Sequence, residues 1–166
     1  MSVDARARSK RLGETIEELV VDRVDGLEAV PDAEAVWHDA RTTHVIGPWD
    51  PVGWGTCVVE PGVNVEIKAA RRRLSTGRRG RVYIRKQQHE RLLATGAAYC
   101  VAVYEGPDDD PTLLAIRIVP ASVVDELCPD EWTTVDAAGR EGEAYAQLAW
   151  SNVVDPADVD GEVAHG

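Results

Sequence analysis

Residues 63–70, VNVEIKAA, carry the alternation that decides the fold. Their valines and isoleucine alternate with polar residues over the first six positions. Because successive side chains of a β-strand point to opposite faces, one face of this strand should be apolar and the other should carry Glu66 and Lys68 together. The stretch therefore predicts a strand that places an acid and a base side by side on one face of a sheet.

The residues before this strand predict a helix, a strand and a hairpin. Residues 10–25, KRLGETIEELVVDRVD, place apolar side chains at helical spacing with charges between them. Residues 34–46 have β-branched character and predict a first strand with its exit loop. TCVVE at residues 56–60 should pair with residues 63–70 in a β-hairpin that turns at Pro61-Gly62.

The residues after this strand continue the mixture of strands and helices. The predicted elements are a short strand, a helix, two buried strands, a short helix and a last strand, at residues 82–84, 85–96, 97–105, 113–119, 121–127 and 144–150. This order favours an α/β fold with a mixed central β-sheet flanked by helices. Residues 1–155 should form a single domain with its core in residues 10–120, and the acidic residues 156–166 a flexible tail.

Charge is distributed very unevenly along the chain. The formal net charge is -11, yet residues 67–91 hold ten basic residues against one acid, Glu90. An acidic chain that concentrates arginine in one stretch is expected to bind a polyanion there, because the planar guanidinium suits phosphate. The basic residues predicted to contact this polyanion are Arg71, Arg72, Arg73, Arg78, Arg79, Arg81, Arg85 and Lys86. The alternative is a solvated basic loop that pairs with the acidic remainder of the protein.

The composition excludes several classes of protein. No segment approaches the roughly 18 consecutive apolar residues of a membrane span, and the N-terminus lacks an apolar signal region. The three cysteines, Cys57, Cys100 and Cys128, show no metal-binding spacing and are expected to be buried. Few lysines, no phenylalanine and many acids are typical of proteins from salt-in halophiles. We therefore expect a soluble, cytoplasmic protein with no membrane partner.

A candidate metal site surrounds the central strand. Asp50 lies in the passage GPWDPVGWG at residues 47–55, and Glu66 and Lys68 share one strand face. Two carboxylates suit Mg²⁺, which neutralises the charge that develops when a phosphodiester is hydrolysed. A neighbouring lysine can orient or deprotonate the attacking water. Because an acid-x-Lys triplet is common by itself, the assignment depends on the motifs around it.

Together these motifs resemble the PD-(D/E)XK nuclease superfamily, with its restriction-endonuclease-like core, and within it the archaeal Holliday junction resolvases. The similarity covers residues 10–105. KRLGETIEE supplies Gly13 and Glu17 at the spacing of the family's first helix, and Asp50 stands 16 residues before the triplet that begins at Glu66. RKQQHERLL supplies the glutamine that the family often places on the next helix.

The resemblance implies an Mg²⁺-dependent DNA endonuclease of DNA repair or recombination, with Mn²⁺ as an alternative ion and a homodimer as one assembly. The implied catalytic residues are Asp50, Glu66, Lys68, Gln88 and Glu17, and the implied metal ligands are Asp50, Glu66 and the backbone carbonyl of Ile67. A non-catalytic DNA-binding protein on the same fold and an RNA-processing nuclease are the alternatives.

Three assignments stay open in the sequence. Asp50 follows Trp49 in place of the family's proline, so Glu60 and Asp39 are alternative metal acids. Gln87 is the alternative to Gln88. His89 could act as an acid or base, although its polar position on the predicted helix favours an exposed side chain.

Overall fold

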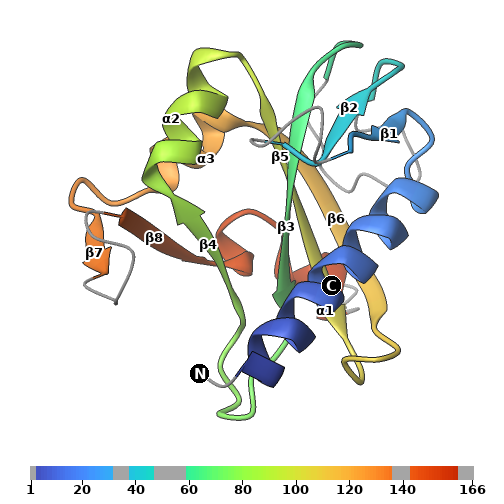
Figure 1. Ribbon diagram of the computed structural model, residues 1–166, viewed down its shortest axis with the longest axis vertical. Helices are drawn as coiled ribbons and strands as arrows, with labels where there is room; N and C mark the ends of the chain where they lie inside the picture. Colours follow the sequence, from blue (N-terminus) through green and yellow to red (C-terminus); the bar gives the residue numbers. More distant parts are fainter. Residues whose placement is uncertain (1–2, 32–37, 47–58, 136–142, 161–166) are drawn as a thin grey trace, which may run out of the picture.

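The computed structural model describes residues 3–31, 38–46, 59–135 and 143–160, which form two β-sheets and the helices packed on them (Figure 1). The central sheet contains, in order, β1 (Leu27–Ala29), β2 (Ala40–Thr42), β3 (Asn64–Arg71), β5 (Ala98–Glu105) and β6 (Thr112–Pro120). The second sheet contains, in order, β4 (Arg81–Arg85), β8 (Glu143–Ala149) and β7 (Thr133–Val135). The helices are α1 (Val3–Arg23), α2 (Lys86–Ala94), α3 (Ala121–Leu127), α4 (Pro156–Asp160) and the short 3-10 helix η1 (Trp150–Asn152). Among them, none combines the length and apolar character that crossing a membrane requires.

The central sheet is mixed, as the sequence predicts. β3 and β5 run parallel, whereas β1, β2 and β6 are antiparallel to their neighbours. Parallel neighbours need a crossover connection, and β4 with α2 forms it between β3 and β5. The α/β fold class is therefore confirmed, and β3 is the middle strand of the central sheet.

Two hydrophobic cores lie on opposite faces of the central sheet. On one face, Ile16 and Val20 of α1 pack against a cluster that includes Val65 and Ile67 of β3. On the other face, α2, α3 and the second sheet bury a cluster that includes Tyr99. Figure 1 shows α1 on one side of β3 and α2 with the second sheet on the other. The alternation in β3 thus turns its apolar positions toward α1 and leaves Glu66 and Lys68 for the face toward α2.

The hairpin expected before β3 is wrong in its pairing. The turn at Pro61-Gly62 is present, and Gly62 has a φ of 83°, a conformation that favours glycine. However, β3 pairs with β2, and Val59 pairs with Ile46. Thr42 of β2 explains the difference, because its backbone N–H donates to the carbonyl of Val63 at 2.9 Å. Residues 47–58, which include most of the expected partner strand, lie outside the described residues.

Residues 156–160 form helix α4 although the composition predicts a flexible tail there. Val159 is buried in the core beneath the second sheet, and Asp160 forms an ion pair with Arg72 at 2.9 Å. One apolar side chain and one ion pair therefore hold this acidic segment against the domain. Residues 161–166 lie outside the described residues.

Candidate active site

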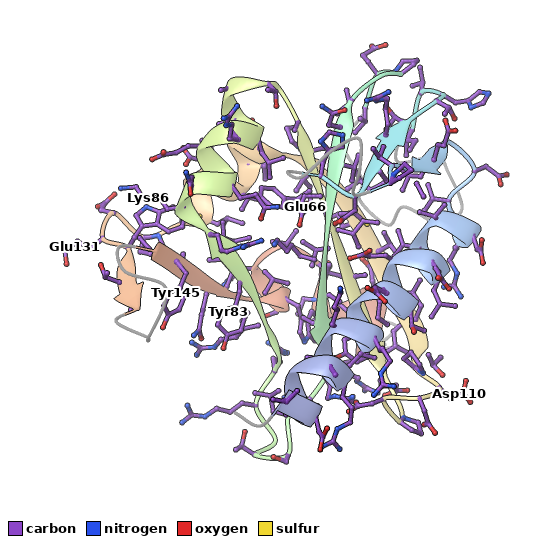
Figure 2. The ribbon with its side chains drawn as sticks, viewed as in Figure 1. Glu66, Tyr83, Lys86, Asp110, Glu131 and Tyr145 are labelled. Carbon is purple, nitrogen blue, oxygen red and sulfur yellow. The ribbon has the colours of Figure 1, made fainter. Side chains whose placement is uncertain are left out.

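Glu66, Lys68 and Gln88 converge on the face of β3 that looks toward α2. Nζ of Lys68 is 3.3 Å from Oε1 of Glu66 and donates a hydrogen bond of 3.1 Å to Oε1 of Gln88. Glu66 and Gln88 are buried, with exposed fractions of 7% and 4%, and Glu66 lies near the centre of the molecule (Figure 2). The acid-x-Lys triplet on β3 is thus in contact with the glutamine of α2, the next helix in the chain. Gln87, the alternative glutamine, is exposed.

Asp39 lies at the edge of β3, immediately before β2 begins. Its backbone N–H donates to the carbonyl of Val65 at 3.0 Å, and its Oδ2 accepts a 2.9 Å hydrogen bond from the backbone N–H of Ile67. The N–H and C=O of one strand residue leave the strand on the same edge, so the Ile67 carbonyl also points toward the edge where Asp39 lies. A carboxylate and a backbone carbonyl therefore meet beside Glu66.

Asp39 also lines a cavity of about 460 Å³ between the central sheet and α1. Ile67 lines it from β3, and Glu17 lines it from α1. Three further acids of α1 complete this side of the cavity: Glu14, Glu18 and Asp22. Glu17, which the sequence predicts to assist the site, therefore reaches the same space as Asp39 and Ile67.

The surroundings of Glu66 favour its protonated form. Burial is the largest cause, and together with the negative charge of Asp39 it raises the pKa of Glu66 to about 7. The charge of Lys68 and hydrogen bonds from Gln88 and Lys68 oppose this rise. The carboxylates of Glu66 and Asp39 are therefore close enough to repel each other when both are charged. A cation bound between them would relieve this repulsion.

Protonation of Glu66 should be visible in the stability of the metal-free protein. The folded pKa near 7 lies above the ordinary value of 4.5, so Glu66 stabilises the fold below pH 4.5, and that contribution is lost as the pH rises through 7. A shift of this size corresponds to on the order of 3 kcal/mol. The free energy of unfolding of wild type minus that of Glu66→Gln should therefore fall by this amount between pH 4.5 and pH 8. Urea unfolding with EDTA across this range measures it, and a difference independent of pH would contradict the shift.

The predicted metal acid Asp50 lies outside the described residues, so its distance from Glu66 is not defined. The two alternatives are placed very differently. Glu60 is exposed at the turn before β3, whereas Asp39 contacts the backbone of Ile67 directly. Of the described candidates, Asp39 is the one whose carboxylate lies next to the triplet.

His89 is buried, so the expected surface position is wrong. Its exposed fraction is 1%, its Nδ1 lies 2.9 Å from the Tyr99 hydroxyl, and its Nε2 lies 2.9 Å from Oδ1 of Asp125. These contacts tie α2 to β5 and α3 directly beside Gln88. The polar pattern of the helix could not reveal this, because α2 packs between other elements on this side.

The basic residues fall into three groups. Arg71 pairs with Asp108, and Arg72 pairs with Glu105 at 3.2 Å and with Asp160. The guanidinium of Arg79 lies over the Trp150 ring, 5.3 Å from its centroid. The side chains that the structure exposes are Arg73, Arg78, Arg81, Arg85 and Lys86. Pairing with the acidic remainder thus applies to Arg71 and Arg72, and the exposed side chains lie at the surface, where phosphate can reach them.

The oxygen atoms at this site fit a hard divalent cation. Within the described residues, no group of three His, Cys, Asp or Glu side chains is arranged to hold a metal ion. Two carboxylates and a backbone carbonyl are nevertheless a suitable donor set for Mg²⁺, which usually keeps several waters and takes only one or two protein carboxylates. Asp39, Glu66 and Ile67 could supply that set.

Comparison with known proteins agrees with the geometry. A family model described as PD-(D/E)XK nuclease superfamily domain matches residues 3–155. No curated protein and no solved structure matches the chain, so the narrower resemblance to Holliday junction resolvases gains no support. The family match covers nearly all of the chain and contains the triplet on β3. The chain therefore belongs to the PD-(D/E)XK nuclease superfamily.

Proposed function

We propose that this nuclease is an Mg²⁺-dependent DNA endonuclease, with Asp39, Glu66 and the Ile67 carbonyl as its metal ligands. The hydrogen bond from Ile67 N–H to Asp39 Oδ2 carries this proposal, because it fixes a second carboxylate at the edge of the strand that bears Glu66. Mn²⁺ should substitute, since it also accepts hard oxygen ligands. Asp50, the acid that the sequence predicts, is the alternative to Asp39 as the second metal carboxylate.

The bound ion would lower the pKa of a coordinated water and neutralise charge on the phosphate. Lys68 is the group of this chain that can orient the attacking water or stabilise developing negative charge. Gln88 restrains the ammonium of Lys68 through a 3.1 Å hydrogen bond, and Glu66 pairs with it at 3.3 Å. Glu17 faces the cavity on the α1 side, where it can hold water near Asp39 and Ile67.

The exposed basic side chains are proposed to hold the DNA backbone. They gather after β3 and along β4, and lead to α2, which carries Gln88. Contacts with phosphate fix the position of DNA without reading its sequence. This arrangement supports cleavage close to the basic surface and leaves the base sequence of the substrate unspecified.

Cleavage assays test the proposed activity. Branched, duplex and single-stranded DNA, with an RNA strand for comparison, are incubated with Mg²⁺, Mn²⁺ or EDTA in molar KCl, because the acid-rich composition suits concentrated salt. We expect DNA cleavage with either ion and none with EDTA. Binding without cleavage under all metal conditions would instead support a non-catalytic DNA-binding protein, and selective cleavage of a four-way junction would support a resolvase.

A further inference from the structure

The outer face of the second sheet carries two tyrosines next to each other. Val82 and Ile84 of β4 point into the core, so the intervening Tyr83 points outward. In the antiparallel register, Tyr83 lies opposite Gln147 and is therefore diagonal to Tyr145 on the same face. The two ring centroids are 5.9 Å apart, with 33° between the ring planes. Figure 2 shows the two side chains beside each other on this sheet.

Tyr83 is unusually exposed for an aromatic residue. Its exposed fraction is 56%, and it is the only aromatic side chain among the large exposed hydrophobic residues of the described part of the chain. A sheet face would ordinarily place such a ring under a covering element, but here it lies on the solvent side of β4. The ring is thus exposed to solvent rather than packed in the core.

Basic residues flank Tyr83 along β4. Arg81 and Arg85 are exposed on either side of Tyr83 on the same face of β4, and Lys86 follows at the start of α2. In a chain with a formal charge of -11, this combination is complementary to an anion that also has flat apolar surfaces. A nucleic acid strand has both properties.

The bases of a duplex are stacked on each other, so their faces are not accessible to tyrosine rings. Unpaired bases can stack on aromatic side chains while basic groups follow the backbone, which is the usual chemistry of single-strand binding. We propose that the outer face of β4 and β8 binds an unpaired DNA strand, with bases on Tyr83 and Tyr145 and phosphates at Arg81, Arg85 and Lys86. The proposal rests on the proposed nuclease function for its choice of DNA and specifies the substrate as one with a single-stranded part.

The chain itself connects this face to the candidate active site. β4 runs directly into α2, and Lys86 stands two residues before Gln88, which contacts Lys68. A strand that binds along β4 is therefore anchored to the same element that restrains the proposed catalytic lysine. This continuity favours a role in substrate placement near the cut.

Fluorescence anisotropy with a labelled oligothymidine strand and a duplex of equal length tests the proposal. Tyr83→Ala should weaken binding of the single strand about tenfold, and Tyr83→Ala/Tyr145→Ala more strongly, with little change for the duplex. Tyr83→Phe keeps a ring and should bind nearly as well as wild type. Leu127→Ala, which removes another exposed apolar side chain, is the matched control. Circular dichroism and thermal unfolding check that each variant folds.

The outcomes separate this surface from the nuclease activity. Unchanged binding of the single strand by the double variant, or equal loss for single strand and duplex, overturns the stacking surface even if wild type cleaves DNA. Selective loss in the tyrosine variants, together with no cleavage by wild type under any metal condition, supports the surface and refutes the proposed activity. Arg81→Gln should also remove about one phosphate contact. The logarithm of the binding constant should then fall less steeply with the logarithm of the salt concentration than in wild type.

Discussion

Glu66→Gln should reduce DNA cleavage at saturating Mg²⁺ by about 100-fold or more. The substitution preserves the size of the side chain and leaves an amide that can still contact Lys68 and Gln88. It removes the negative charge that a divalent ion requires from this residue. DNA affinity should stay within about twofold of wild type, because the proposed phosphate contacts lie on other residues. Single-turnover cleavage and binding in Ca²⁺, measured on the same DNA, separate the two effects.

Gln87→Ala provides the matched control for this prediction. Gln87 is exposed and adjacent to Gln88, so its loss should change neither cleavage nor binding appreciably. Cleavage by Glu66→Gln within tenfold of wild type would remove Glu66 from the catalytic machinery. A parallel fall of cleavage and binding would indicate that the residue serves the fold or the DNA interface instead.

Trp150→Ala should lower the free energy of unfolding by about 3–5 kcal/mol. The side chain is fully buried, and its Nε1 donates a 3.0 Å hydrogen bond to the Arg72 carbonyl. Its backbone N–H donates to the carbonyl of Gly80, and the Arg79 guanidinium lies over its ring. The substitution therefore opens a large cavity and removes the side-chain contacts with Arg72 and Arg79, while the backbone hydrogen bond to Gly80 is kept. A decrease in Tm of roughly 10 °C follows from typical unfolding entropies.

Thermal and urea unfolding at constant KCl measure this effect. Trp150→Phe retains most of the buried ring and loses the hydrogen bond, so its destabilisation should be clearly smaller than that of alanine. Leu127→Ala, at a side chain that is 38% exposed, should change stability little. A loss below about 1 kcal/mol in Trp150→Ala would show that the packing around η1 contributes little to the fold.

The sequence predicts the local parts of the site well. Alternation within β3 is a property of neighbouring residues, so it places Glu66 and Lys68 on one face without knowledge of the rest of the chain. The place of Gln88 on a helix is also predicted, because α2 begins and ends close to the expected positions. The structure then adds what spacing alone could not give, namely the contact between Gln88 and Lys68.

The other parts of the site and fold could not be predicted, because they depend on contacts between residues far apart in the sequence. Asp39 stood only as an alternative because its position beside Ile67 depends on β2 pairing with β3 across the turn at residues 61–62. The ion pair between Arg72 and Asp160 joins residues 88 positions apart, so neither the intramolecular use of this arginine nor helix α4 was visible in local composition. The burial of His89 cannot be predicted from its helix for the same reason, because it is set by contacts with α3 and β5.

The metal acid is tested most directly by Mg²⁺-dependent cleavage in Asp39→Asn and Asp50→Asn, measured as single-turnover rates beside wild type. Both substitutions remove one negative charge and little volume, so they form a matched pair. If Asp39 and Glu66 hold the ion, Asp39→Asn should cut the rate by about 100-fold or more at Mg²⁺ concentrations that saturate wild type, and Asp50→Asn should retain most of the activity. A wild-type rate in Asp39→Asn together with an inactive Asp50→Asn would contradict this site and return the ligand to Asp50.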